Sequence, residues 1–193
     1  MDNCGPQNKN WSLYTALVAF VNSKQWSFQS ITLKYFEAGH TFMSADSFHH
    51  QVEKSVAQRK HLYNFGEFAE CVGKAGKVIL MKSECFQQWE NKLSQGKISK
   101  ETRPLLDDVV IATFSRNEYC FRFKRSYSEE SEWEEANFLQ KMFLKNVCAG
   151  IEYDPPKKIY NGISQDRKDD IISKLVPLIP EAFKDFWMSL KAH

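Results

Sequence analysis

The stretch SITLKYFEAGHTFMSADSFHHQVEKSV, residues 30–56, carries two hydrophobic periods in succession. In its first part Ile31, Leu33 and Tyr35 alternate with polar residues, which is the pattern of a β-strand with one buried face. Gly39 follows as a turn residue and marks the end of this predicted strand. After Gly39 the spacing of the apolar residues is different, and this change in hydrophobic period decides the fold class that we expect.

The second part of the stretch, Ala45 to Val56, has the period of an amphipathic helix. At about 100° per residue, Phe48, Val52 and Val56 form one narrow apolar stripe. A helix that follows a strand in this way is typical of layered α/β proteins. We therefore expect an α/β fold in which this stripe packs against the core.

The same predicted helix carries a compact set of polar groups. Asp46, His50 and Glu53 fall within roughly 60° of one another on a face different from the apolar stripe. Carboxylates and imidazoles bind metal ions and transfer protons, so this face could carry chemistry. Any surface helix also has a polar face, and the spacing i, i+4, i+7 arises often by chance. Both interpretations remain open at this point.

The rest of residues 1–105 continues the alternation of helix and strand. Asn10 is suited to cap a helix over residues 11–21. A short helix is predicted over 67–72, a compact apolar strand over 77–83 and another helix over 84–93. These elements predict a layered α/β core.

From residue 106 the pattern changes. The segments 107–115 and 118–126 predict two strands that form a hairpin. The acidic segment 128–138 is weakly periodic, and we expect a loop or a frayed helix start there. The tail shows two amphipathic helices bent at the Pro-Leu-Ile-Pro sequence of residues 177–180. Residues 106–193 are therefore predicted to form an α+β tail with a hairpin and terminal helices.

Composition limits the classes of protein. Of 193 residues, 42% are hydrophobic and 14% aromatic, and the net charge is +2, so we expect a folded chain without an overall basic field. The five cysteines include no C-x-x-C pair, which favours reduced thiols. The sequence shows neither the pattern of a signal peptide nor a run of about 20 apolar residues. We expect an intracellular protein, nuclear or cytoplasmic and not secreted, without contact with a membrane.

Three segments together resemble a known family. MDNCGPQNKNWSLYTALVAFVN (1–22) and ITLKYFEAGHTFMSADSFHHQVEK (31–54) look like the second half of a transposon-derived, DDE-type, ribonuclease-H-like domain found in many animal proteins. The motifs that carry the resemblance are Asp-Asn-Cys, Gln-Asn-Lys-Asn, Gly-His-Thr and the Asp, His and Glu residues that follow. DRKDDIISKLVPLIPEAFKDFW (166–187) loosely resembles the ending of the same proteins.

The resemblance implies both a fold and a chemistry. Residues 1–105 would form the C-terminal half of a ribonuclease-H-like core. Asp2 would be the second carboxylate of the catalytic triad, and Asp46 or Glu53 the third. These carboxylates would bind Mg²⁺ or Mn²⁺ for phosphodiester cleavage or strand transfer on DNA. His40 and His50 would sit beside the metal or orient a phosphate.

The family also requires a first aspartate on an earlier strand, and the printed sequence does not contain that strand. Because one missing metal ligand removes both affinity and alignment, we expect this chain to be catalytically inactive by itself. It would be either a fragment of a longer transposase or nuclease, or a domesticated remnant. The alternative function is a non-catalytic module that binds protein or nucleic acid.

Two groups of residues are candidates for contact with nucleic acid. Asn3, Gln7 and Lys9 lie in the polar segment before the first predicted helix. Arg122 and Lys124 alternate with aromatic residues in the second strand of the hairpin, and Arg125 follows them. A phosphate-contacting edge is one interpretation of this pattern, and a solvated strand face is the other.

Overall fold

The structure of the chain is a computed structural model, and it describes residues 8–36, 43–82, 85–86, 89, 104–157 and 162–193. Its internal contacts divide the chain into two compact units, each made from two separate pieces of sequence. Unit 1 contains Met1–Thr41 and Gln87–Pro156, and unit 2 contains Phe42–Phe86 and Lys157–His193. The two units are therefore interleaved along the sequence.

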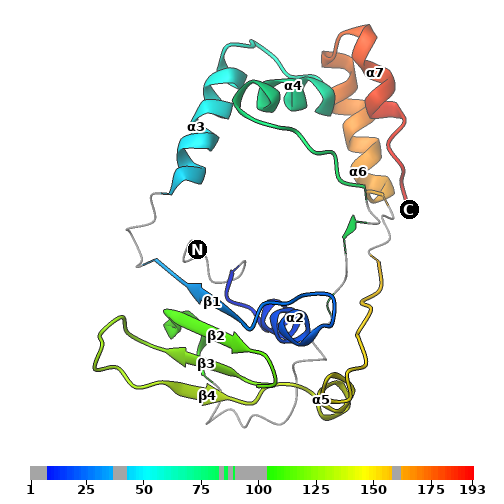
Figure 1. The fold of residues 1–193 in the computed structure, drawn as a ribbon. Helices are drawn as coiled ribbons and strands as arrows, with labels where there is room; N and C mark the ends of the chain where they lie inside the picture. The colour runs from blue at the N-terminus through cyan, green and yellow to red at the C-terminus, as the bar shows by residue number, and fades with distance from the viewer. Residues whose placement is uncertain (1–7, 37–42, 83–84, 87–88, 90–103, 158–161) are drawn as a thin grey trace. The chain divides into compact units, whose positions relative to one another are not determined.

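Unit 1 is built around a four-stranded antiparallel sheet with the order β1-β2-β3-β4 (Figure 1). The strands are β1 (Ser30–Lys34), β2 (Ile111–Ser115), β3 (Phe121–Lys124) and β4 (Glu134–Ala136). A short 3₁₀ helix, η3 (Leu106–Asp108), precedes β2. The predicted hairpin is confirmed as β2 and β3, and Asn117 in its turn has a positive φ of 66°. Asparagine tolerates this left-handed conformation better than most residues do.

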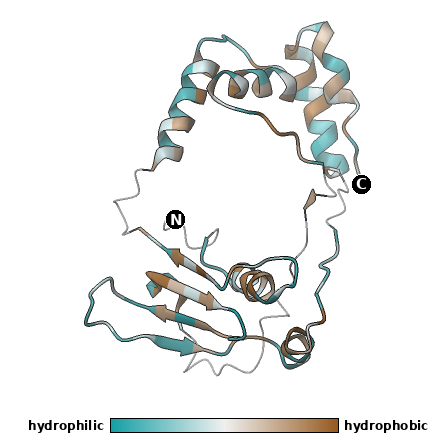
Figure 2. Ribbon diagram, in the orientation of Figure 1, coloured by the Kyte–Doolittle hydropathy of each residue, from teal (hydrophilic) through white to brown (hydrophobic). Residues whose placement is uncertain are grey.

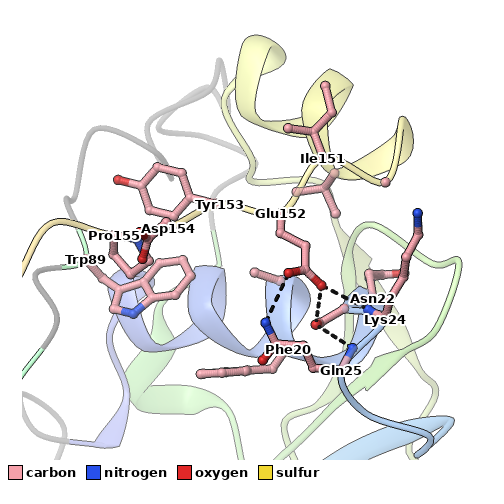
Figure 3. Close-up of a pocket in the computed structure, with 14 residues that line it drawn as sticks. Phe20, Asn22, Lys24, Gln25, Trp89, Ile151, Glu152, Tyr153, Asp154 and Pro155 are labelled. Atoms are coloured by element: carbon pink, nitrogen blue, oxygen red, sulfur yellow. Dashed lines mark hydrogen bonds between the residues drawn. The ribbon is translucent and has the colours of Figure 1, made fainter. Parts of the chain in front are cut away.

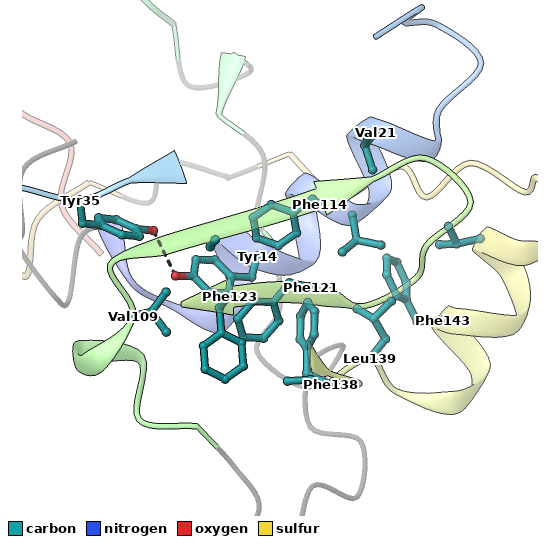
Figure 4. Close-up of a cluster of buried hydrophobic side chains, with 14 residues drawn as sticks. Tyr14, Val21, Tyr35, Val109, Phe114, Phe121, Phe123, Phe138, Leu139 and Phe143 are labelled. Atoms are coloured by element: carbon teal, nitrogen blue, oxygen red, sulfur yellow. Dashed lines mark hydrogen bonds between the residues drawn. The ribbon is translucent and has the colours of Figure 1, made fainter. Parts of the chain in front are cut away.

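The inner face of the sheet packs against helix α2 (Trp11–Asn22) and forms the core of unit 1 (Figure 4). Phe121 is central, because its ring centroid lies 6.0 Å from that of Phe114, 5.1 Å from that of Phe123 and 5.0 Å from that of Tyr14. Helix α5 (Lys141–Cys148) adds Phe143 to this cluster. Each such aromatic side chain buries a large apolar area, which stabilises the unit.

Helices α2 and α5 of unit 1 each begin where a side chain can cap them. The Asn10 side chain accepts a hydrogen bond from the backbone N–H of Leu13 at 2.8 Å, so the predicted helix 11–21 and its cap are confirmed. The Gln140 side chain accepts from two backbone N–H groups at the start of α5. Such caps satisfy amide groups that have no partner inside the helix.

Unit 2 begins with the helix pair α3 (Ser44–Ala57) and α4 (Phe65–Ala75). The predicted helix over 45–56 is confirmed as α3. Helix α4 extends the predicted helix 67–72 at both ends, and Asn64 caps its start. Where α3 and α4 pack together, the Cys71 thiol donates to the backbone carbonyl of Ser55. Phe48 of the predicted apolar stripe lies over Gly76, where an added Cβ would come within 2.9 Å of its ring.

The tail of unit 2 confirms the predicted bend. Helix α6 (Gln165–Asp170) continues through a π-helical turn, η4 (Ile171–Leu175), and a 3₁₀ turn, η5 (Val176–Leu178), before α7 (Glu181–Met188) begins. Figure 2 shows α6 as hydrophilic. Helix α7 is amphipathic, and its Trp187 indole donates to the Tyr63 carbonyl at 2.6 Å while Phe183 stacks on the Tyr63 ring. These contacts tie the tail to the segment that precedes α4.

The mixed α/β class is confirmed, whereas two local predictions are wrong. Residues 77–82 of the predicted strand 77–83 are described and lie outside any strand, and the side chains of Ile79 and Leu80 are 71% and 68% exposed. A strand needs a neighbour to receive its backbone hydrogen bonds, and this segment pairs with no described strand. The acidic segment 128–138 contains β4, which pairs with β3. Most of the predicted helix 84–93 lies outside the described residues.

The domain boundary predicted at residues 105/106 differs from the observed division into units. This boundary falls between β1 and β2, which are neighbours in one sheet. β1 precedes the boundary by many residues, and periodicity within a segment carries no information about which distant strand will pair with it. A ribonuclease-H-like arrangement of residues 1–105 stays a prediction.

Candidate functional site

Helix α3 carries the polar face that the sequence indicated. Asp46, His50 and Glu53 are all exposed, and α3 presents them on a side different from that of the buried Val52. Asp46 also has a local structural task, because its carboxylate accepts a hydrogen bond from the backbone N–H of Met43 at 2.6 Å. A carboxylate at this position caps the helix and interacts favourably with the helix dipole.

His50 and Glu53 form a loose pair farther along α3. His50 Nδ1 lies 3.8 Å from Glu53 Oε2, and the two side chains are 63% and 78% exposed. Seven residues of helix rise by about 10.5 Å, so Asp46 and Glu53 are too far apart along the axis to bind one ion together easily. In the metal site that the family resemblance implies, the two carboxylates would therefore be alternative ligands. Since Asp46 is engaged in capping, Glu53 is the better placed of the two.

The remaining residues of the predicted metal site, Asp2 and His40, lie outside the described residues, as do Asn3 and Gln7. Within the described ranges, no three His, Cys, Asp or Glu side chains are grouped closely enough to hold a metal ion. The set that the family resemblance implies needs Asp2 as a ligand.

Lys9, one of the candidates for contact with nucleic acid, is buried. Its side chain is only 5% exposed, donates a hydrogen bond to the Asp107 carbonyl at 2.8 Å and lies over the Tyr35 ring. Burial lowers the pKa of Lys9, and the nearby charges of Asp107 and Asp108 partly oppose this effect. These contacts favour a structural role, in which Lys9 joins the segment before α2 to η3.

The outer face of the sheet gathers a second group of predicted residues. Arg122 and Lys124 alternate with the buried Phe121 and Phe123 and therefore point away from the core. The indole ring of Trp133 contacts both of them, with its centroid 5.6 Å from the Arg122 guanidinium carbon and 5.4 Å from Lys124 Nζ. Both cations thus lie over one partly exposed aromatic ring.

Strand pairing extends this face beyond β3. Thr113 of β2 lies opposite Arg122, and Ile111 of β2 lies opposite both Lys124 and Lys34. Three cationic side chains on β1 and β3 therefore flank an uncharged strip on β2. On the other side, Glu135 of β4 lies opposite Arg122 and is the nearest acidic residue in the register. We call Lys34, Arg122, Lys124 and Trp133 the outer-face group.

Arg125 does not share this arrangement. Its guanidinium group binds the Glu134 carboxylate at 2.7 Å and the Asp108 carboxylate at 3.1 Å, and it lies over the ring of Phe123. The hydrogen bond to Glu134 raises the pKa of Arg125 above its usual value. A guanidinium group already paired with two carboxylates is a poor choice for binding a phosphate.

Sequence reasoning missed one cavity in unit 1 altogether. A pocket of about 370 Å³ lies where the end of α2 meets the segment after α5 (Figure 3). Its lining includes the aromatic rings of Phe20, Trp89 and Tyr153 and the carboxylate of Glu152. These residues come from three distant parts of the sequence, so no local motif announces them. Trp133 was missed for a similar reason, because it lies in a segment that we expected to be a loop or helix start.

Comparisons of the chain with models of known families, with curated proteins and with solved structures give no match. In the part of the chain that the structure describes, every helix is too short or too polar to cross a lipid bilayer.

Proposed function

We propose that this chain is a nucleic-acid-binding module derived from a DDE-type, ribonuclease-H-like transposase or nuclease domain, and that DNA is its partner. The observation that carries the proposal is the contact of both Arg122 and Lys124 with the Trp133 ring on the outer face of the sheet. Cations attract the phosphate backbone, and an exposed aromatic ring offers a surface for a base. This combination of cations and an aromatic ring is a more specific indication of nucleic-acid binding than the net charge of +2.

The arrangement of charges suggests how a nucleic-acid strand would lie on the outer face of the sheet. Lys34 and Lys124 flank the uncharged Ile111, so a phosphate placed over β2 would have a cation on each side. Arg122 is exposed, and Trp133 retains 43% of its accessible surface. A four-stranded antiparallel sheet that carries aromatic and basic residues on its open face is a common platform for nucleic acids.

The catalytic part of the ancestral function would need groups beyond the described residues. We propose that Asp2 and Glu53, with Asp46 as the alternative to Glu53, would be ligands for Mg²⁺ or Mn²⁺ in a complete domain. Such an ion would activate a water molecule and stabilise the leaving oxygen. The catalytic set that the resemblance implies needs a further carboxylate besides these, and we propose that this chain does not cleave DNA by itself.

The binding proposal is tested with the double variant Arg122→Gln/Lys124→Gln. Fluorescence anisotropy with a labelled oligonucleotide at low salt should show a loss of affinity of about tenfold or more, because two phosphate contacts are removed. The salt dependence of binding should also become shallower. A matched control is Lys141→Gln/Lys145→Gln on α5, which removes the same charge from exposed positions of the same unit.

The outcomes separate a defined binding face from a general charge effect. Equal losses in both double variants would mean that only the overall charge matters, and the proposal for the outer face would be wrong. Absence of binding by the unmodified chain would refute the function itself.

Catalytic inactivity is tested with supercoiled plasmid and Mg²⁺ or Mn²⁺. We expect no nicking by the purified chain. Metal-dependent nicking that is abolished by Asp46→Ala or by Glu53→Gln would disprove inactivity and would also show which of the two carboxylates takes part. Nicking that survives both substitutions would point to a contaminating nuclease, so the measurement is repeated with the preparation of each variant.

A further inference from the structure

The pocket of unit 1 is chemically different from the outer face. It has a volume of about 370 Å³, which is in the range of cavities that bind small organic groups. One wall is aromatic: the centroids of Phe20 and Trp89 are 6.2 Å apart, and those of Trp89 and Tyr153 are 5.3 Å apart. In Figure 3 this aromatic wall and the Glu152 carboxylate lie on adjoining sides of the pocket.

Glu152 is held in a fixed orientation by the start of the loop after α2. Its Oε1 accepts hydrogen bonds from the Ser23 hydroxyl at 2.9 Å and the Lys24 backbone N–H at 3.2 Å. Its Oε2 accepts from the Gln25 side-chain amide at 3.0 Å. The hydrogen bonds from Ser23 and Gln25 lower the pKa of Glu152, so the group is an anion at neutral pH. Because a carboxylate oxygen can accept two hydrogen bonds, Oε2 has capacity for one further donor.

The charges around the pocket favour a cation as its ligand. Glu152 and Asp154 contribute two carboxylates to the lining, and Lys24 contributes one ammonium group. A phosphate would be repelled by this balance, which distinguishes the pocket from the outer-face group. An aromatic wall beside a carboxylate suits a cation that can stack on a ring and donate a hydrogen bond at the same time.

We propose that this pocket binds a guanidinium group, namely an arginine side chain of a polypeptide partner. Guanidinium is planar and weakly hydrated, so it can lie against the faces of Phe20 and Trp89, whereas an ammonium group holds its water more strongly. One of its N–H groups would donate to Oε2 of Glu152. Phe20 is 40% exposed, which leaves its ring accessible to such a ligand.

The proposal is tested by titrating the full chain with the peptide acetyl-Gly-Arg-Gly-amide. The peptide with citrulline in place of arginine is the neutral analogue, the peptide with lysine carries the same charge without the planar group, and free arginine lacks the polypeptide context. The readout is the indole N–H signal of Trp89 in NMR spectra, assigned by its loss in Trp89→Phe. We expect the arginine peptide to bind. The affinity of each of the other three ligands should be lower by about tenfold or more.

Three substitutions give the expected signs. Glu152→Gln should weaken binding about tenfold, because the charged acceptor is lost. Lys24→Gln should strengthen binding, because it removes the competing cation while the backbone N–H that holds Glu152 remains. Glu130→Gln is the control, since it removes an exposed carboxylate of unit 1 that does not line the pocket.

Several results would overturn the proposal. Binding of the citrulline peptide as tightly as the arginine peptide would exclude recognition of charge, and equal binding of the lysine peptide would exclude recognition of the planar group. Equal binding of free arginine would refute the assignment to a polypeptide. If Glu152→Gln does not fold, Phe20→Leu decides, because it keeps both carboxylates and the Trp89 signal and removes one of the two stacking rings. Unchanged affinity in that variant would refute the site.

Discussion

The phenol hydroxyl of Tyr14 donates a hydrogen bond to the hydroxyl of Tyr35 across the buried contact between α2 and the strand end of β1, with the two oxygens 3.1 Å apart. The direction follows from the next bond, because Tyr35 donates its own proton to the Asn8 carbonyl at 2.7 Å. Both rings are fully buried. This chain of hydrogen bonds joins the helix, the strand and the segment before the helix.

Removing the two hydroxyls should therefore have unequal effects. Tyr35→Phe removes both hydrogen bonds of the chain, whereas Tyr14→Phe removes one. We expect the free energy of unfolding to fall by about 2 kcal/mol in Tyr35→Phe and by about 1 kcal/mol in Tyr14→Phe. Urea unfolding of the two variants and of the double variant measures these losses. Equal losses would contradict the direction assigned to the hydrogen bonds.

Stability should decline at alkaline pH. Burial raises the pKa of Tyr14 and of Tyr35, and it raises the pKa of Cys120 to about 11. The folded state thus holds these protons more tightly than the unfolded chain does, so their contribution is complete below the unfolded pKa values and is lost as pH rises toward the folded ones. Lys9, with a lowered pKa, acts in the opposite direction.

We expect the free energy of unfolding to fall above pH 9, the ordinary pKa of a thiol, and the fall to be less steep in Tyr14→Phe. Urea unfolding in steps of pH from 8 to beyond the tyrosine range provides the measurement. A free energy of unfolding that rises over this range would mean that the lowered pKa of Lys9 determines its pH dependence. The three raised pKa values would then have the smaller effect.

The thiols should differ strongly in reactivity. Cys71 and Cys120 are buried, whereas Cys85 and Cys148 are exposed. The raised pKa of Cys120 lowers its thiolate fraction at neutral pH by about a hundredfold, and the thiolate is the reactive form. Alkylation with iodoacetamide followed by peptide mass spectrometry should modify Cys85 and Cys148 first. Modification of Cys120 at the same rate would show that unit 1 opens readily.

Gly162 is the glycine that we expect to tolerate substitution least. Its φ is +94°, and an added Cβ would lie 2.3 Å from the Lys191 carbonyl oxygen. We expect Gly162→Ala to lower the stability of unit 2 by about 1–3 kcal/mol and to break the bridge between Ile163 and Ala192. Thermal unfolding is the measurement. Gly73→Ala in α4 is the control, because its Cβ has ordinary space and alanine favours the helix.

Trp133 should discriminate between single-stranded and duplex DNA. Stacking of a base on an aromatic ring is worth about 1–3 kcal/mol and requires an unpaired base. We therefore expect Trp133→Ala to weaken binding of a single strand more than binding of a duplex. Trp26→Ala is a suitable control, since Trp26 is 50% exposed in the same unit but belongs to the loop before β1. Equal losses for both kinds of DNA would exclude stacking.

Local patterns predicted local structure well in this chain. The Asn10 cap, the helix α3 and the β2–β3 hairpin all depend on residues that are near one another in sequence, and all are confirmed. The apolar run at 77–82 led to a wrong prediction of a strand. Apolar composition favours burial, but it does not show whether a neighbouring strand is present to pair with the segment. β4 was missed because its acidic residues point to solvent or to Arg125, which conceals the usual strand composition.

The candidate sites show the same limit more sharply. Arg122 and Lys124 were found because alternation along one strand predicts a common face. The pocket depends on Phe20, Trp89 and Glu152, and only tertiary packing brings these together. The position of Lys9 in a polar segment gives no sign of its contacts with Tyr35 and η3, because these residues lie far away in the sequence.

The pairing of β1 with β2 has a consequence for the order of events during synthesis. The hydroxyl of Thr32 on β1 forms a hydrogen bond with that of Thr113 on β2, which is synthesised 81 residues later. Until then β1 has no partner strand in the nascent chain, and part of the aromatic core is exposed. Helices α3 and α4 can associate earlier, because they are close to each other in the sequence. Such a large sequence separation makes closure of the sheet a slow step, and it is the period in which the emerging polypeptide would most need a chaperone.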